Sequence, residues 1–131
     1  MKAAVVAFPI LLGACASSWP SGSYVAVSRD DAAVLAPVIA NYLAGAIPSG
    51  AAVSLAPAKS DDVMAPIITV DLDREGVPRT TDGHRVQYIA EPMDGGVFLR
   101  VSIDGREGGS RYFSRVNGTL SPAGPMMVAL P

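Results

Sequence analysis

The sequence predicts a small single domain of the α+β class that follows a lipoprotein signal peptide. In the first half of the chain, apolar residues recur at the spacing of one helix face. In the second half, they alternate along three consecutive segments, which Asp-Gly turns join. One or two helices packed on one face of a three-stranded antiparallel meander are the expected product.

The first 14 residues have the layout of a secretory signal. Lys2 gives a positive start, and the apolar run over residues 3–12 is too short to span a bilayer. The stretch Leu12-Gly13-Ala14-Cys15 resembles the bacterial lipobox, in which the cysteine thiol receives a diacylglycerol and the signal is cleaved. Lipidation of Cys15, the single cysteine, would leave no free thiol in an oxidising compartment. A plain signal peptide or a buried N-terminal helix is the alternative.

The composition after cleavage suits one periplasmic domain on a lipid anchor. Removal of 14 of the 131 residues leaves 117, with nine basic and twelve acidic side chains and no basic run. Nucleic acid is therefore not an expected partner. Acyl chains such as palmitate, at about 0.8 kcal/mol per buried methylene, make a stable anchor. Because Ala16 and not aspartate follows Cys15, the bacterial sorting rule predicts the outer membrane, with the domain facing the periplasm.

Residues 15–27 are expected to be the lipidated cysteine and a linker, and residues 28–131 the folded domain. The linker is rich in serine, glycine and proline. Trp19 within it is a candidate for contact with the membrane interface, with a partner or with its own domain.

A helix is predicted to begin at Ser28, an N-cap followed by acidic residues in the first turn. Its apolar stripe continues to Leu43, and the Gly45 to Gly50 segment ends it. Pro37 interrupts the stripe, so that a kink or a later start is expected.

The segment 61–75 fits both a strand and a helix, and we favour a helix that ends at Gly76 because Asp62 and its neighbours resemble a cap. A short strand is expected over residues 52–56, and a loop over residues 78–83. The tail from Ser121 to Pro131 is expected to lie along the surface.

The alternating segments predict one apolar face for the meander. That face contains Val86, Tyr88, Ala90, Val97, Leu99, Val101, Ile103, Tyr112, Ser114 and Val116. Phe98 and Phe113 then point to the opposite face, where they cover a second helix or join Trp19 as possible partner contacts. If they are exposed, replacing both phenylalanines by serine should leave folding intact.

Chemistry-bearing residues are few, and we expect no catalytic residue, no metal and no cofactor apart from the covalent lipid. His84 is the only histidine, and a Ser-His-Asp set with Asp82 has no G-x-S-x-G turn beside it. A solvated or loop-bonded histidine is therefore favoured. The spacing from Asp71 through Gly76 to Asp82 echoes a calcium loop, although Asp82 stands where glutamate belongs and Pro78 where an apolar residue belongs. A solvated acidic face is the favoured interpretation.

Several segments resemble TrbH, a family of small lipoproteins of conjugative transfer loci. They are the lipobox, the Ser23 to Ala26 segment, the Asp30-Asp31 helix that runs into Tyr42-Leu43, and the closing stretch Tyr112 to Gly124. None of them is a catalytic signature, and residues 59–83 contribute little to the resemblance. The resemblance implies assembly at the outer-membrane end of a type IV secretion (mating-pair formation) complex, beside TrbG-like and TrbI-like core subunits. The alternatives are a free-standing envelope lipoprotein that regulates a cell-wall enzyme or a stress response, and a hydrolase on a lipid tether.

Overall fold

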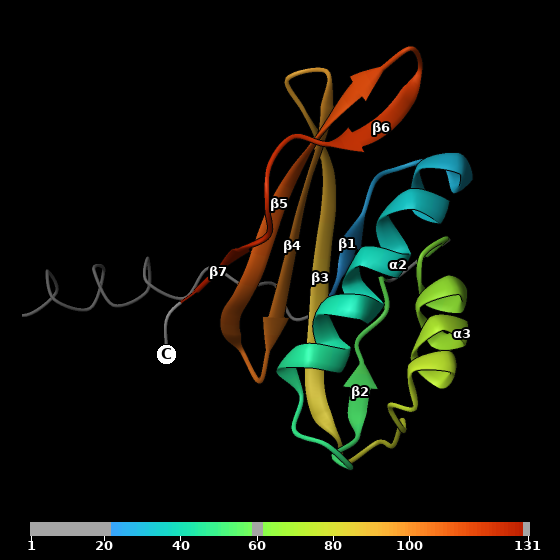
Figure 1. Cartoon of the computed structure of the whole chain (residues 1–131). Coiled ribbons are helices and arrows are strands. Elements are labelled where there is room, and N and C mark those ends of the chain that lie inside the picture. Colours follow the sequence, from blue (N-terminus) through green and yellow to red (C-terminus); the bar gives the residue numbers. More distant parts are fainter. Residues whose placement is uncertain (1–21, 59–61, 130–131) are drawn as a thin grey trace, which may run out of the picture.

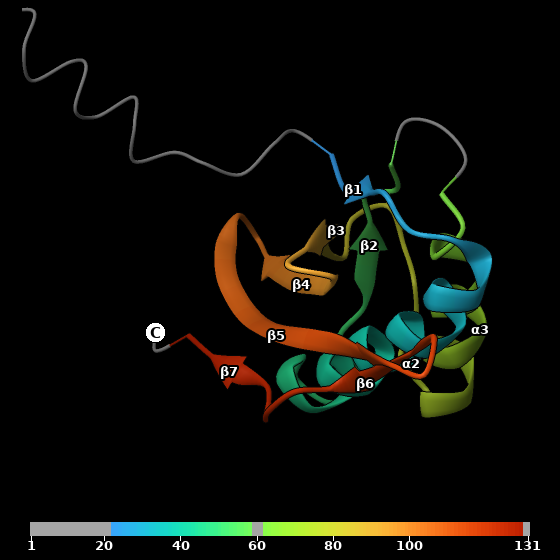
Figure 2. The ribbon, with the colours of Figure 1, turned by 90° about the horizontal axis from the view of Figure 1, so that it is seen from above.

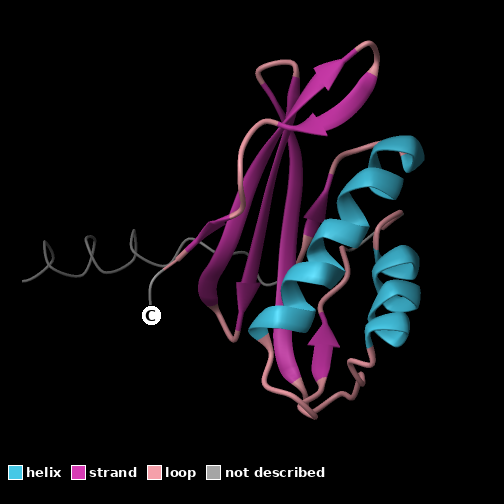
Figure 3. Ribbon diagram, viewed as in Figure 1, coloured by secondary structure: helices cyan, strands magenta, loops and turns pink. Residues whose placement is uncertain are grey.

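The computed structural model describes residues 22–58 and 62–129, which form one α+β domain as predicted. Both helices lie on the same side of the sheet (Figures 1 and 3). In chain order, the elements are β1 (Tyr24–Val25), α2 (Arg29–Ala46), β2 (Val53–Leu55), α3 (Ala65–Glu75), β3 (His84–Met93), β4 (Gly96–Ile103), β5 (Arg106–Val116), β6 (Thr119–Pro122) and β7 (Met127–Val128).

The predicted meander is the centre of the sheet, where β3, β4 and β5 pair antiparallel. The turns Asp94-Gly95, Asp104-Gly105 and Asn117-Gly118 each place two successive residues at positive φ. That is the type I′ conformation, whose twist matches the twist of the flanking strands. Both β6 and β7 pair with β5, so the C-terminal tail extends the sheet at this edge. The sequence pattern of the tail did not predict this strand pairing.

The opposite edge of the sheet consists of two short strands placed end to end along β3. β2 runs parallel to the start of β3, and β1 runs parallel to its middle at Ile89 and Ala90. Ser23 fills the junction, because its Oγ accepts the Tyr88 backbone N–H at 3.0 Å and its own N–H donates to the Ala56 carbonyl. The segment predicted as linker therefore contains β1, and the folded domain begins before Ser28.

Helix α2 begins at the predicted cap, since Ser28 Oγ accepts the Asp31 N–H at 3.2 Å. The helix runs from Arg29 to Ala46 as one element through Pro37, so a later start is wrong. Pro37 lies on the exposed side, where water can bond the carbonyl that the proline leaves without a donor. The other side of α2 is packed in the core through Leu35, Ile39 and Leu43.

Within the segment 61–75, helix α3 confirms the helical interpretation for Ala65–Glu75. It ends at Gly76, whose φ of 76° is the left-handed conformation that glycine adopts at a helix C-terminus. Asp62 caps the other end, because its Oδ1 accepts the backbone N–H groups of Met64 and Ala65 at 2.9 and 3.0 Å. Two side chains of α3, Ile68 and Leu72, are buried in the core.

The Tyr88 side chain joins the sheet to α3 inside the core. It is fully buried, and its hydroxyl donates to Asp62 Oδ2 at 2.6 Å. The same Oδ2 accepts the Ala58 N–H at 2.9 Å. Burial, and then the hydrogen bond to the Asp62 carboxylate, raise the pKa of the Tyr88 phenol well above its usual range.

The predicted orientation of Phe113 is wrong, and a β-bulge explains why. Val101 pairs with Gly109 and Ser102 with Glu107, which leaves Gly108 as an extra residue in β5. The extra residue shifts the alternation by one, so that Phe113 and not Tyr112 stands opposite Val97. Phe113 is consequently buried in the core with Val97, whereas Tyr112, Ser114 and Val116 point away from the helices.

We predict that serine at position 113 and serine at position 98 have different effects on stability. Phe113→Ser should lower the free energy of unfolding by about 3–5 kcal/mol, because it empties a fully buried site. Phe98 is only half-buried, so Phe98→Ser should cost about 1 kcal/mol. Urea denaturation of the two variants measures the difference, and equal losses would contradict the bulged register.

A second prediction concerns the Tyr88 hydroxyl. Tyr88→Phe should lower the free energy of unfolding by about 1–2 kcal/mol, because Asp62 loses a short buried hydrogen bond. Because the folded-state pKa is raised, only the unfolded chain ionises this phenol above about pH 10, and the stability that it contributes is lost as the pH rises further. Denaturation midpoints between pH 8 and pH 11 should therefore fall more steeply in the parent protein than in Tyr88→Phe, and equal slopes in the two proteins would contradict this effect.

Candidate functional site

The predicted lipidation site lies outside the described residues. This holds for Leu12, Gly13, Ala14 and Cys15, and equally for Trp19. The structure therefore bears on function through two features of the folded domain, a polar surface pocket and the sheet face that carries no helix.

The polar pocket lies where the C-terminal end of α2 approaches the β4–β5 turn. Its volume is about 640 Å³, and it contains the only histidine of the chain. His84 Nδ1 lies 2.7 Å from Asp104 Oδ2. The carboxylate partner of His84 is therefore Asp104, twenty residues further along the chain, rather than the neighbouring Asp82 considered from the sequence.

Asp104 is held in place by the first residues of β3. Its Oδ1 accepts the Arg85 N–H at 2.9 Å, and its own N–H donates to the Arg85 carbonyl at 2.7 Å. The hydrogen bond with His84 and then the one from the Arg85 N–H lower the pKa of the Asp104 carboxyl. The sequence carries a signal for the turn at Asp104-Gly105 but none for its pairing with His84, which depends on the β3–β4 register.

The remaining polar residues of the pocket do not complete a nucleophilic site. Burial, and then the nearby charge of Glu107, raise the pKa of the Tyr42 phenol, so that this hydroxyl stays protonated at neutral pH. The described residues that line the pocket include no serine, threonine, cysteine or lysine. A histidine oriented by an aspartate activates a nucleophile in hydrolases, and here the described lining supplies none.

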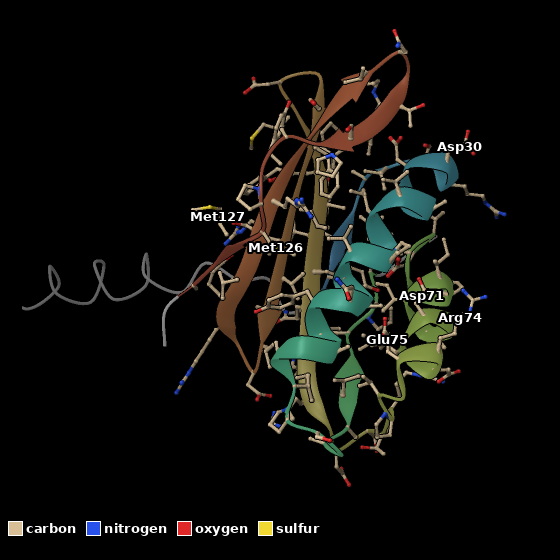
Figure 4. All side chains as sticks on the ribbon, viewed as in Figure 1. Asp30, Asp71, Arg74, Glu75, Met126 and Met127 are labelled. Carbon is tan, nitrogen blue, oxygen red and sulfur yellow. The ribbon has the colours of Figure 1, made fainter. Side chains whose placement is uncertain are left out.

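The acidic segment at the end of α3 does not form the calcium loop considered from the sequence. Asp71, Asp73 and Glu75 belong to the helix, so they cannot wrap around an ion as loop ligands do. Figure 4 shows Asp71 and Glu75 on this helix. Asp71 pairs with Arg74 at 3.3 Å, and Asp73 pairs with Arg79 at 3.2 Å. Within residues 22–58 and 62–129, no cluster of three or more histidine, cysteine or carboxylate side chains is placed to hold a metal.

The sheet face away from the helices carries aromatic and apolar side chains at its surface. Phe98 lies there between Glu91 of β3 and Tyr112 of β5, as the strand alternation requires. Tyr24 of β1 and Met127 of β7 are 51% and 66% exposed at the two edges of the same face. Of the three predicted partner contacts, Phe98 is thus at the surface, Phe113 is in the core, and Trp19 is outside the described residues.

None of the helices in the described part of the chain is both long and apolar enough to cross a membrane. Comparisons of the sequence with models of protein families and with curated proteins, and of the fold with solved structures, found no match. The candidate site is therefore interpreted from its own residues.

A third prediction concerns the His84–Asp104 pair. Asp104→Asn keeps the left-handed turn and an acceptor for the Arg85 N–H but removes the charge. Because both groups are well exposed, the variant should lose less than about 1 kcal/mol of unfolding free energy at pH 7. The pKa of Asp104 is lowered in the fold, so this contribution disappears as the pH falls below about 4, and the two proteins should converge there. Urea midpoints at pH 7 and pH 3 measure the convergence, and a constant difference would contradict it.

Proposed function

We propose that this protein is an outer-membrane lipoprotein, anchored through Cys15, that stabilises a conjugative type IV secretion complex as TrbH-like proteins are expected to do. The observation that carries the proposal is the stretch Leu12-Gly13-Ala14-Cys15 behind a short apolar run. The expected partners are the TrbG-like and TrbI-like core subunits, and the domain is expected to face the periplasm.

The position of β1 supports a role close to the membrane. Only eight residues separate Cys15 from Tyr24, where the first strand begins. Even a fully extended segment of this length spans only about 30 Å. A domain tethered by acyl chains on Cys15 would therefore work within one domain diameter of the bilayer surface.

The character of the described surface also supports assembly. The sheet face that carries no helix presents Phe98 and Tyr112 beside exposed apolar side chains at the sheet edges. Partly exposed aromatic residues on a rigid sheet are suitable contacts for another protein.

The proposed anchor predicts the mass and the location of the mature protein. Mass spectrometry should find an acylated Cys15 as the new N-terminal residue, with the first 14 residues removed. The acylated chain should sediment with outer membranes, whereas Cys15→Ser should lack the lipid and keep the uncleaved signal. A bare thiol on Cys15 in the membrane-extracted protein would contradict the proposal.

The proposed partners are tested by recovering the complex from detergent-solubilised outer membranes of cells that assemble the conjugative apparatus. The acylated protein should bring TrbG-like and TrbI-like subunits with it. Phe98→Ser should weaken the recovery, whereas Val70→Ser, at an exposed apolar position of α3, serves as the matched control and should not. Recovery of the domain alone, with its lipid present, would favour a free-standing envelope lipoprotein.

A further inference from the structure

The two helices end beside each other at one end of the domain. Helices α2 and α3 pack side by side and run in the same direction, as Figures 1 and 2 show. Their C-terminal ends therefore lie at the same end of the molecule, where the described residues form a surface pocket of about 470 Å³. Its described lining is the end of α2 with the loop that follows, residues 44–51, and the end of α3, residues 75–77. We call it the helix-end pocket.

The end of α2 brings unpaired backbone carbonyl groups to this pocket. In an α-helix each carbonyl accepts the N–H four residues later, so the last four carbonyls need other donors. The residue four positions after Ala44 is Pro48, which has no N–H to donate. Among the described residues, only the Leu43 carbonyl of these four accepts a backbone N–H, which Ile47 donates at 2.9 Å.

The described lining of the pocket is negative. α2 has no basic residue in its last turn, and Glu75 is the only charged side chain among the described residues that line the pocket. A helix C-terminus carries about half a negative charge, so the two helix ends add to the charge of the Glu75 carboxylate. A cation is therefore the ligand that this surface favours.

The two arginines next to this end of α3 do not supply that cation. Arg74 pairs with Asp71 at 3.3 Å, and its side chain is 77% exposed, whereas Arg79 pairs with Asp73 at 3.2 Å. One helical turn before Glu75, the Asp71 Oδ2 atom is buried and accepts no hydrogen bond from the described residues. Figure 4 shows Asp71 and Glu75 along the same helix. The arginines are thus used on their own carboxylates, and the charge of Glu75 is left over.

We propose that the helix-end pocket binds an arginine side chain of a partner protein. A guanidinium has five N–H donors and no acceptor, which matches a lining of carbonyl and carboxylate oxygen atoms. A calcium ion would instead need six to eight oxygen ligands around one point. Within residues 22–58 and 62–129, no group of three or more histidine, cysteine or carboxylate side chains is placed to hold a metal. The proposal goes beyond the function proposed above, and it depends neither on the lipid nor on Phe98.

The first test measures binding of a small arginine probe. The isotope-labelled, full-length Cys15→Ser chain in detergent is titrated with N-acetyl-arginine amide, and the citrulline analogue serves as the neutral probe of the same shape. The arginine probe should shift the NMR signals of the amides in residues 44–51 and 75–77 at millimolar concentration, whereas the citrulline probe should not. Glu75→Gln should weaken the binding by about fivefold or more. Glu91→Gln, on the sheet face away from the helices, is the matched control and should not. Equal shifts with both probes, or an unchanged dissociation constant in Glu75→Gln, would overturn the proposal.

The second test places a cation of the chain's own at the end of α2. Ala46→Lys should abolish the shifts caused by the arginine probe and should raise the urea midpoint, because a cation stabilises a helix C-terminus. Ala33→Lys, at an exposed position in the first half of α2, is the matched control and should do neither. Undiminished probe binding in Ala46→Lys would overturn the proposal.

Calcium chloride is the third probe of the same labelled chain. It should leave the amide signals of the pocket unchanged at the concentration at which the arginine probe shifts them. Equal or larger shifts with calcium would make this a metal site and would overturn the proposal. Because the Cys15→Ser chain carries no lipid and keeps Phe98, failure of the arginine proposal is distinguishable from failure of the proposed function.

Discussion

The hydrogen bond between Tyr88 and Asp62 joins the start of the second helix to the centre of the sheet. Tyr88 is on β3, the strand that pairs with β4 on one side and with both β1 and β2 on the other. Its hydroxyl has to bond within the protein because it is fully buried, and Asp62 accepts it at 2.6 Å. The same carboxylate accepts the first free N–H groups of α3. One side chain thus satisfies a buried hydroxyl and a helix N-terminus together, and it holds α3 against the core.

Both helices of the described residues lie on the same side of the sheet. The core is filled by α2, by α3 and by alternate residues of the meander, so the second face is available to other chain segments or to partners. The two features that could serve function both lie outside the helix-packed core. The His84–Asp104 pair lies at the end of the sheet where strands turn, and Phe98 lies on the helix-free face. A domain with this layout offers its partners a surface more readily than an enclosed cavity.

The elements that were predicted from the sequence are those with local signals. Ser28, Gly76 and the two Asp-Gly turns act through their own backbone, so their positions can be derived from neighbouring residues. The orientation of Phe113 depends instead on the single extra residue at Gly108. A Cβ there would lie 2.7 Å from Tyr42 Oη, a contact that only the assembled fold creates. The positions of β1 and β7 and the pairing of His84 with Asp104 could not be predicted for the same reason. Each depends on pairing with a strand that is distant in the sequence.

The short connection between Cys15 and β1 also explains how so small a surface could serve an assembly. A free protein needs a large interface to bind a partner tightly, because association costs translational and rotational freedom. If Cys15 is acylated as proposed, the eight residues before Tyr24 keep the start of the domain within about 30 Å of the membrane surface. Partners at the same surface then meet the domain at a high effective concentration, and a modest patch around Phe98 and Tyr112 suffices. Under this proposal the lipid contributes to binding by confinement, and the sheet face contributes specificity.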